Sequence, residues 1–252
     1  MTTDTEKQQL RQTIRRLAAQ LSPRYRTAAD AAIARHLLAL PEYQSAGAVF
    51  CFVSAGREID TRPILERALA DGKTLCVPLC VADGIMEPRA VRDLKELSPG
   101  AYGILEPPAG SPRLSPDQID LAVIPCVTCS REGRRLGRGG GYYDRFLAHY
   151  RGAAVLVCRE RLLRQEIPFG VHDYPVPWVV TEAGLFEDGT PARPGGARIG
   201  LPPTKSSKFI SISPQDFVGV LPSLCLTGPR NSDKLEKASF PASQTHKGGP
   251  SA

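Results

Sequence analysis

One short segment of the chain combines glycines and arginines in a pattern that can bind phosphate. The run is Gly133-Arg134-Arg135-Leu136-Gly137-Arg138-Gly139-Gly140-Gly141-Tyr142-Tyr143-Asp144. Glycines let backbone N–H groups approach a ligand without obstruction from Cβ, and a helix N-terminus adds partial positive charge. The arginines add forked donors that match phosphate oxygens. The alternative is a flexible, solvated Gly/Arg loop, but the two tyrosines and the aspartate directly after the glycines argue against it.

Two well-known phosphate loops differ from this segment. A Walker loop has a lysine and a hydroxyl residue after its last glycine, whereas two tyrosines stand there, so a P-loop NTPase is excluded. A dinucleotide-binding fold is a more serious rival, because Glu160 lies near the position expected to bind ribose. Its glycines, however, come directly at the end of a strand, whereas Gly137 comes ten residues after Val127. An NAD(P)-dependent oxidoreductase therefore ranks as an alternative.

Two carboxylates are candidates for a metal site. Asp144 at the start of a predicted helix can cap that helix, which is the commoner use, or hold a metal. Magnesium bound to nucleotide phosphates usually takes one or two protein carboxylates and otherwise water. Glu166-Ile167-Pro168 followed by His172-Asp173 offers the second carboxylate on a proline-rich loop. Taken alone, His172-Asp173 is more typical of a turn.

The N-terminal part of the chain predicts two amphipathic helices. Leu10, Ile14, Leu17 and Leu21 recur at three- and four-residue spacing, which indicates a helix over residues 6–21. Ser22-Pro23 can begin the next, because serine caps free N–H groups and proline suits the first helical position. This second helix should run over residues 23–40 and end before Pro41.

The chain then alternates buried strands with helices. Short, continuously apolar runs are typical of strands covered on both faces, and a strand, a helix and a strand within some thirty residues form a parallel βαβ unit. The predicted strands are 48–53, 75–79, 121–127, 153–157 and 178–181. One predicted helix runs through Ile64, Leu65, Ala68 and Leu69, is capped by Thr61-Arg62-Pro63 and is ended by Asp71-Gly72. A further helix is predicted over 142–150. The fold class is therefore α/β, a three-layer Rossmann-like domain with a mostly parallel central sheet.

The chain's positive charge is concentrated in its last quarter. The formal net charge is +6, and residues 191–252 hold eight Lys or Arg and three Asp or Glu, besides nine prolines and seven glycines. This segment is typical of a disordered or weakly ordered tail, and residues 1–190 form the predicted domain. Since that domain is almost neutral, the basic composition does not indicate nucleic-acid binding by the folded part.

Cysteine use and hydropathy predict a cytoplasmic protein with no membrane partner. Five of the seven cysteines (Cys51, Cys76, Cys80, Cys126 and Cys158) lie in apolar, strand-like runs, where a thiol behaves as a small hydrophobe. No apolar run approaches the roughly 20 residues of a membrane span, and no secretory signal is apparent. Cys126 and Cys129 have redox- or zinc-like spacing, but no second pair follows at finger distance, which favours coincidence near a core strand.

Several motifs together resemble the 5-formyltetrahydrofolate cyclo-ligase (5,10-methenyltetrahydrofolate synthetase) family. They are Arg135 to Leu147, Ile167-Pro168, His172-Asp173 and Val180-Thr181-Glu182, with Lys7 to Arg11 and Ser54 to Glu58 nearer the N-terminus. The likeness covers residues 7–186 and leaves the tail outside. It implies a fold of the NagB/RpiA/CoA-transferase type and a small-molecule ligase, and it leaves the oligomeric state open.

The resemblance implies an ATP-dependent, magnesium-requiring closure of a ring in reduced folate. ATP would phosphorylate the formyl oxygen on N5, N10 would attack the activated carbon, and phosphate would leave, giving 5,10-methenyltetrahydrofolate and ADP. Proteins catalyse phosphoryl transfer mainly by positioning the reacting groups and neutralising their charge. A glycine loop rich in arginine fits both tasks.

The resemblance also implies a role for individual residues. ATP would contact Lys7, Arg11, Arg135, Leu136, Gly137, Arg138, Gly139, Gly140, Gly141, Tyr142 and Tyr143. The folate would contact Val53, Glu58, Arg138, Gly139, Gly140, Gly141 and Tyr142, with Arg138 and Tyr142 as catalytic residues. Asp144 and Asp173 would hold Mg²⁺. Without the resemblance, the favoured interpretation of Lys7 and Arg11 is that both are solvated surface charges. The corresponding alternative for Glu58 is a surface pair with Arg62 at i+4.

The chain departs from the family pattern beside this site. Cys129-Ser130 stands where a phenylalanine and an aspartate are common, and a frequent glutamine is replaced near Arg161. These changes bear on rate or folate affinity rather than on the class of reaction. A non-catalytic nucleotide- or RNA-binding relative is the remaining alternative, although the tail has no block of aromatic and basic residues of the RRM type.

Overall fold

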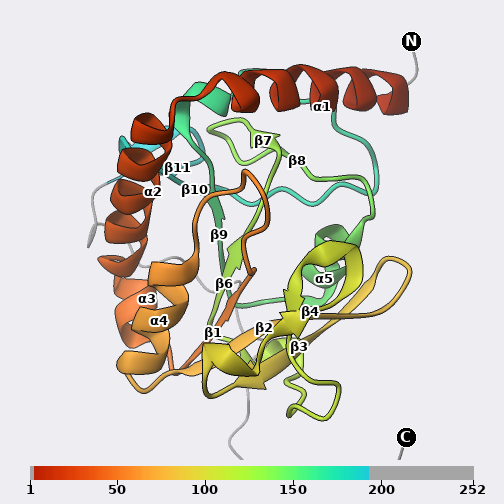
Figure 1. The fold of residues 1–252 in the computed structure, drawn as a ribbon. Coiled ribbons are helices and arrows are strands. Elements are labelled where there is room, and N and C mark those ends of the chain that lie inside the picture. Colours follow the sequence, from red (N-terminus) through yellow and green to blue (C-terminus); the bar gives the residue numbers. More distant parts are fainter. Residues whose placement is uncertain (1–2, 193–252) are drawn as a thin grey trace, which may run out of the picture. The chain divides into compact units, whose positions relative to one another are not determined.

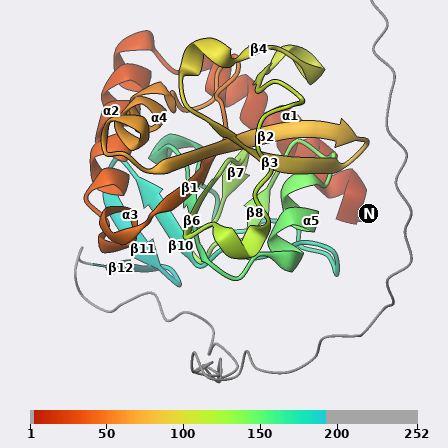
Figure 2. The same cartoon turned by 90° about the horizontal axis from the view of Figure 1, so that it is seen from below.

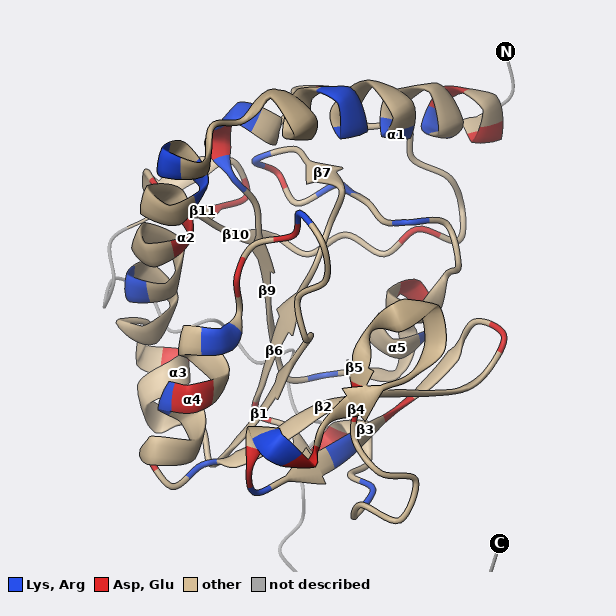
Figure 3. Ribbon diagram, viewed as in Figure 1, with Lys and Arg blue, Asp and Glu red and all other residues tan. Residues whose placement is uncertain are grey.

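The computed structural model describes residues 3–192, which Figures 1 and 2 show from two directions. The predicted tail lies outside these residues, except for its first two positions. No helix in this part of the chain is long and apolar enough to cross a membrane. Basic and acidic residues are interspersed over its surface elements (Figure 3), in agreement with the small net charge counted for the domain.

Three helices form the N-terminal part of the fold. They are α1 (Thr3–Gln20), α2 (Pro23–Leu38) and α3 (Pro41–Ser45). The Ser22 cap is confirmed, because its Oγ accepts a hydrogen bond of 3.2 Å from the Tyr25 N–H. The second predicted helix ends two residues early, at Leu38, since Pro41 occupies the first position of the separate short helix α3.

One large sheet, parallel in its centre, confirms the predicted α/β class. Its eight strands follow the order β12-β11-β10-β9-β6-β1-β2-β3, and the five from β10 to β2 are parallel to one another. The strands are β1 (Ala48–Cys51), β2 (Thr74–Ala82), β3 (Ile85–Val91), β6 (Leu121–Ile124), β9 (Ala153–Val157), β10 (Trp178–Thr181), β11 (Gly184–Glu187) and β12 (Thr190–Ala192). The predicted strands 153–157 and 178–181 have the observed bounds.

Helices cover both faces of this sheet, because successive strand residues point to opposite sides. Val49 of β1 packs with α2 and with α4 (Arg62–Ala70), whereas the next residue, Phe50, packs with α1 and with α5 (Tyr142–His149). Both side chains are fully buried. Burial of such a side chain stabilises the fold by roughly 1.5–3 kcal/mol. Because the two residues pack with different helices, each face of β1 is covered by its own helical layer.

Thr61 occupies the N-cap position of α4, as predicted, but its side chain makes no capping hydrogen bond. Asp60 accepts the hydrogen bond from the Arg62 N–H at 3.0 Å, while the Thr61 hydroxyl donates to the Phe52 carbonyl at 2.9 Å. Thr61 also accepts a bond of 3.1 Å from the Ser54 N–H. Its side chain therefore fastens the segment after β1 instead of starting the helix.

Antiparallel additions extend the parallel centre, and the sequence analysis did not predict them. β3, β11 and β12 enlarge the sheet, and two small hairpins lie outside it. The hairpins pair β4 (Ser98–Pro99) with β5 (Leu105–Glu106) and β7 (Thr128–Cys129) with β8 (Arg135–Leu136). Short 3₁₀ turns occupy Leu94–Glu96, Ala101–Gly103, Pro116–Gln118 and Glu160–Leu162. The strand predicted over 121–127 ends at Ile124, because Pro125 has no N–H for the ladder.

Candidate active site

A cavity of about 980 Å³ lies beyond the carboxyl ends of β1 and β6. Its volume is at the upper end of the range for small-molecule sites. The residues that the family resemblance implied for ATP, folate and metal all line this one cavity: Lys7, Arg11, Val53, Glu58, Arg135, Leu136, Gly137, Arg138, Gly139, Gly140, Gly141, Tyr142, Tyr143, Asp144 and Asp173. The fold thus brings together residues from both ends of the domain.

The glycine segment 137–141 forms a loop between β8 and α5. The hairpin β7–β8 stands between β6 and this loop, which explains why the glycines do not follow the strand directly. Gly139 and Gly141 have φ of 109° and 70°, a region that favours glycine. No backbone N–H of residues 138–141 donates a hydrogen bond within residues 3–192. The loop therefore presents unpaired donors beside the first turn of α5.

Helix α1 is joined to the glycine loop and to the loop after Gly170. Arg11 Nε donates to the Gly137 carbonyl at 2.8 Å, and Lys7 Nζ lies 2.7 Å from Asp173 Oδ1. Burial, and secondarily the charge of Arg15, lowers the pKa of Arg11. Lys7 and Arg11 are therefore cavity residues on one helical face, not solvated surface charges.

Arg135 and Asp144 form an ion pair at the base of the loop. Arg135 Nη2 lies 2.6 Å from Asp144 Oδ1, and the Arg135 side chain is 4% exposed. Arg135 Nε is buried and has no hydrogen-bond partner in residues 3–192. Asp144 does not cap α5, because Gly141 occupies the N-cap position. The carboxylate is therefore available to the cavity and is held there by a buried cation.

The ring of Tyr143 supports the same guanidinium. The Arg135 guanidinium lies 5.9 Å from the centre of this ring. The centre of the Phe50 ring lies 6.4 Å from the same point. Burial raises the pKa of Tyr143, so its hydroxyl stays protonated at neutral pH. Tyr143 is therefore a neutral positioning group for Arg135.

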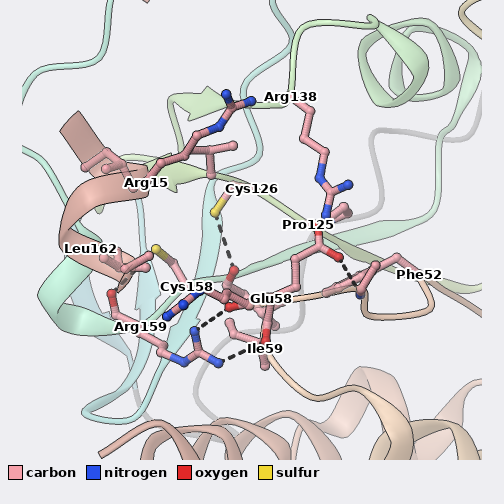
Figure 4. A pocket seen from close by; sticks show the side chains of 16 residues that line it. Arg15, Phe52, Glu58, Ile59, Pro125, Cys126, Arg138, Cys158, Arg159 and Leu162 are labelled. Carbon is pink, nitrogen blue, oxygen red and sulfur yellow. Dashed lines mark hydrogen bonds and ion pairs between the residues drawn. The ribbon is translucent and has the colours of Figure 1, made fainter. Parts of the chain in front are cut away.

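Glu58 and Arg138 form a second ion pair across the cavity. Arg138 Nη2 lies 2.7 Å from Glu58 Oε1, and the Ala55 N–H donates to Glu58 Oε2 at 2.9 Å. The alternative pair of Glu58 with Arg62 is not observed, because Arg62 pairs with Glu66. Figure 4 shows Glu58 and Arg138 at an adjoining pocket of about 310 Å³.

A buried arginine fixes the segment that carries Glu58. The Arg159 guanidinium binds both carboxylate oxygens of Asp30, at 2.7 and 2.8 Å. It also donates to the carbonyls of Arg57 and Glu58, at 2.9 and 3.0 Å. These four hydrogen bonds satisfy the buried carboxylate and carbonyl oxygens, so the Glu58 backbone is held firmly.

One wall of the cavity comes from the antiparallel additions, which were not predicted from the sequence. Met86, Tyr102 and Glu106 line it, and Tyr102 Oη lies 3.2 Å from Tyr142 Oη. Arg145 donates to the carbonyls of Gly140 and Gly84, at 2.9 and 3.0 Å, and so joins this wall to the glycine loop. Asp83-Gly84 between two apolar runs is a hairpin signal that could have revealed β3.

The oxygen donors of the cavity suit a hard cation. Asp144 and Asp173 both line it, beside the loop amides, and each carboxylate is already bound to one cationic side chain. Within residues 3–192 no cluster of three oxygen or nitrogen ligands occurs. Two carboxylates that share a metal with phosphate oxygens and water fit Mg²⁺, which seldom uses an all-protein cage.

Three other residues from the sequence analysis lie away from the cavity. Glu160 accepts hydrogen bonds from Thr181 and Arg131, at 2.6 and 2.7 Å, and lines neither pocket. Arg161 lies over the Tyr25 ring at 4.3 Å. Glu166 is also absent from the cavity wall. A ribose-binding role for Glu160 therefore has no support in this geometry.

Comparison with known proteins relates most of the chain to one enzyme family. A family model described as the 5-formyltetrahydrofolate cyclo-ligase family matches residues 3–182. A probable 5-formyltetrahydrofolate cyclo-ligase of Schizosaccharomyces pombe is 28% identical over 193 residues, which are 70% of this chain and 95% of that protein. The Escherichia coli K12 cyclo-ligase is 28% identical over 186 residues, 69% of this chain and 99% of that protein. The mitochondrial cyclo-ligase of Arabidopsis thaliana is 33% identical over 165 residues, 59% and 60% respectively.

Solved structures agree with the sequence comparison. The NMR structure of Aquifex aeolicus 5,10-methenyltetrahydrofolate synthetase matches with a TM-score of 0.65 at 28% identity, over 77% of this chain and 98% of that one. The Mycoplasma pneumoniae synthetase matches with a TM-score of 0.58 at 18% identity, over 70% and 98%, which shows the shared fold alone.

Proposed function

Because the chain belongs to the 5-formyltetrahydrofolate cyclo-ligase family, we propose that its large cavity binds ATP together with 5-formyltetrahydrofolate. The family reaction converts 5-formyltetrahydrofolate to 5,10-methenyltetrahydrofolate. The observation that carries the proposal is the junction of α1 with the glycine loop, where Arg11 bonds to Gly137 and Lys7 lies in the same cavity. This junction supports a nucleotide site assembled from both ends of the domain.

The nucleotide phosphates bind at the glycine loop. The unpaired N–H groups of residues 138–141 supply donors, and α5 begins directly after them. Lys7 and Arg135 supply charge, and the carboxylates that they bind now are replaced by phosphate oxygens when ATP enters. The exchange keeps each buried cation paired, so it avoids the cost of an uncompensated charge.

The same exchange frees Asp144 and Asp173 to hold Mg²⁺. A bound magnesium ion neutralises phosphate charge and orients the transferred group. Before ATP binds, Arg135 and Lys7 hold the two carboxylates in place, because each cationic side chain is largely buried beside its partner. The metal site is therefore prepared by the residues that later bind the phosphates.

The folate occupies the side of the cavity next to Val53 and Glu58. Glu58 has one carboxylate oxygen on the Ala55 N–H and the other on Arg138. Pterin N–H groups can take the place of Arg138 on that carboxylate, which releases the guanidinium toward the phosphates. Binding of folate thereby prepares Arg138 for the chemical step.

The reaction has two bond-making steps. The formyl oxygen attacks the γ-phosphorus and ADP leaves. N10 then attacks the formyl carbon, loses its proton, and phosphate departs with the former formyl oxygen. Arg138 neutralises the transferring phosphoryl group, and Tyr142, whose hydroxyl is already bound to Tyr102, hydrogen-bonds the phosphorylated oxygen. These roles need positioning and charge and no covalent enzyme intermediate.

A coupled assay of the full chain tests this function. Purified protein is incubated with 5-formyltetrahydrofolate, ATP and Mg²⁺, and methenyl absorbance, ADP and phosphate are followed together. We expect one ADP and one phosphate for each methenyl product, and no product without ATP. If no methenyl product forms in the presence of ATP, the proposal is wrong. ATP binding without turnover would indicate the non-catalytic relative, and thermal protection by NAD(P) would indicate the oxidoreductase.

A further inference from the structure

Three cysteine thiols meet beside the large cavity. The Sγ atoms of Cys126, Cys129 and Cys158 all lie within 4.8 Å of one another, and they are the only such group of three found in residues 3–192. The sequence revealed only the first two, at a spacing that coincidence explains equally well. The third thiol directly follows another strand, β9, so its approach is a property of the fold.

Strand pairing explains why Cys158 joins the other two. β6 and β9 are parallel, with Ile124 opposite Leu156, and Cys126 and Cys158 each stand two residues further along. The hairpin β7–β8 then turns Cys129 back toward this point. The backbone of two strands and one hairpin therefore fixes the cluster, rather than a single mobile loop.

We propose that Cys126, Cys129 and Cys158 form a zinc site of three thiolates whose fourth position opens toward the cavity. Thiolates select zinc or monovalent copper over hard cations. Zinc–sulfur bonds of about 2.3 Å in a tetrahedral site place sulfurs roughly 3.8 Å apart. The thiols already lie near this spacing, so each sulfur needs to move by about 1 Å or less.

Burial and access differ among the three thiols in the way that such a site requires. Cys129 is fully buried and Cys158 is 3% exposed, whereas Cys126 is half-buried and lines both the large cavity and the small pocket. Figure 4 shows Cys126 and Cys158 at that pocket. An ion can therefore enter through the pocket, and water fills its fourth position, as in zinc sites that keep one position open.

The three thiols bind their protons unequally. Hydrogen bonds from Cys129 and Cys158, and secondarily the charge of Arg135, hold the pKa of Cys126 well below its usual value, whereas hydrogen bonding to Cys126 raises the pKa of both Cys129 and Cys158. Arg15 and Arg138 also line the small pocket. Three thiolates and one divalent ion together carry one net negative charge, which these guanidinium groups offset. Binding releases the protons of the remaining thiols, so affinity rises with pH.

This site is independent of the folate proposal, because metal binding tests it and turnover does not. Reduced full-length protein carrying Cys225→Ser, so that the thiol outside residues 3–192 does not contribute, is titrated anaerobically with Co²⁺ and then with Zn²⁺. We expect one equivalent of Co²⁺ to give thiolate-to-metal charge-transfer bands and the visible bands of a tetrahedral ion. Zn²⁺ should displace it and protect three thiols from a thiol reagent.

Substitutions in the same background identify the ligands. Cys126→Ser, Cys129→Ala and Cys158→Ala should each abolish the bands and weaken Zn²⁺ binding by more than about 100-fold, since even outer-shell partners cost 10–100-fold. The control is Cys80→Ser, which removes a thiol of the large cavity outside the cluster and should change neither. Thermal melts establish that each variant is folded. Equal metal binding by Cys126→Ser and the parent, or no thiolate bands in the parent, would overturn the site.

Discussion

Lys7 on the first helix forms an ion pair with Asp173, which lies 166 residues further along the chain. The two side chains are 12% and 15% exposed, so both are largely removed from water. Asp173 also accepts a hydrogen bond of 2.6 Å from the Gly170 N–H. This pair fastens the helix proposed to supply cations for the nucleotide to the loop proposed to supply a metal carboxylate, and it joins the two ends of the proposed site.

Substitution of this lysine tests the coupling. Lys7→Met should raise the KM for ATP about tenfold, or about 1.4 kcal/mol, because a hydrogen bond to a charged group is lost in the complex. The kcat should change less, since the transferring groups are held by other residues. Steady-state kinetics with varied ATP at saturating folate measures the effect.

An exposed lysine serves as the control for the change of charge. Lys95→Met removes an exposed ammonium group that does not line the cavity and should leave the KM for ATP unaltered. If both variants shift the KM equally, a general electrostatic effect explains the result and the assignment of Lys7 to the phosphates is wrong.

Asp144→Asn should reduce activity and magnesium affinity together. The variant keeps the size of the side chain but loses the charge that binds Mg²⁺ and pairs with the buried guanidinium of Arg135. We expect a loss of roughly 10- to 100-fold in activity and a rise in the Mg²⁺ concentration for half-maximal rate. The melting temperature should fall as well, because Arg135 is left with a neutral partner.

Asp30→Asn is the matched control, since Asp30 also pairs with a buried arginine, Arg159. It should lower the melting temperature by a comparable amount while the Mg²⁺ concentration for half-maximal rate stays constant. A similar change of magnesium dependence in both variants would show that destabilisation alone accounts for the behaviour of Asp144→Asn.

Gly141→Ala should impair ATP binding beyond its effect on stability. The backbone there has φ of 70°, and a Cβ would lie 2.7 Å from Arg145 Nη1, which must then move from the loop carbonyl that it binds. Left-handed backbone costs about 1–2 kcal/mol for an L-residue. We expect that loss in the free energy of unfolding, together with weaker ATP binding by calorimetry.

Gly72→Ala separates strain from function. Gly72 has φ of 71°, a Cβ at this position would have no atom within 4 Å, and the residue lies in the turn between α4 and β2. Its alanine variant should lose similar stability and retain ATP affinity. Equal affinity in the two variants would argue that the geometry of the glycine loop is not what ATP requires.

The parallel centre of the fold could be predicted because its strands are buried on both faces and read as continuous apolar runs. The bounds of β9 and β10 follow directly from such runs. β3 was missed because Glu87, Pro88 and Arg89 interrupt its apolar residues along a half-exposed edge, and proline is rare within strands. Pairing with β2 decides that segment, and its own composition does not. The same holds for the short hairpins, whose strands are two residues long.

The candidate site was identified through the family resemblance and not through spacing. Local chemistry indicated a phosphate-binding segment over residues 133–144, but it left Lys7 and Glu58 as surface charges. The fold brings these two residues to one cavity across long sequence separations. Cys158 shows the limit most clearly, because only the register of two parallel strands takes it to Cys126.

Glu58→Gln should weaken folate binding selectively. The amide oxygen still accepts hydrogen bonds, but the side chain no longer carries the charge that pairs with Arg138 and would attract pterin N–H groups. We expect the KM for 5-formyltetrahydrofolate to rise about tenfold while the KM for ATP changes little. Glu66→Gln removes a comparable but exposed pair with Arg62, worth about 0–1 kcal/mol, and should affect neither constant. A rise in the KM for ATP alone would contradict the assignment of Glu58 to the folate.

A chain that ends at Ala192 should retain turnover. All residues of the large cavity lie between Asp4 and Tyr174, and the family match ends at residue 182. The cut is placed after Ala192 because β12 pairs with β11, and a cut after Asp188 would remove that edge strand. The shortened and full-length proteins should have the same kcat and KM values within about twofold, and melting temperatures within a few degrees. Loss of activity in a protein that ends at Ala192 and still melts cooperatively would show that residues 193–252 contribute to the site. A chain cut after Asp188 should be less stable whether or not those residues contribute.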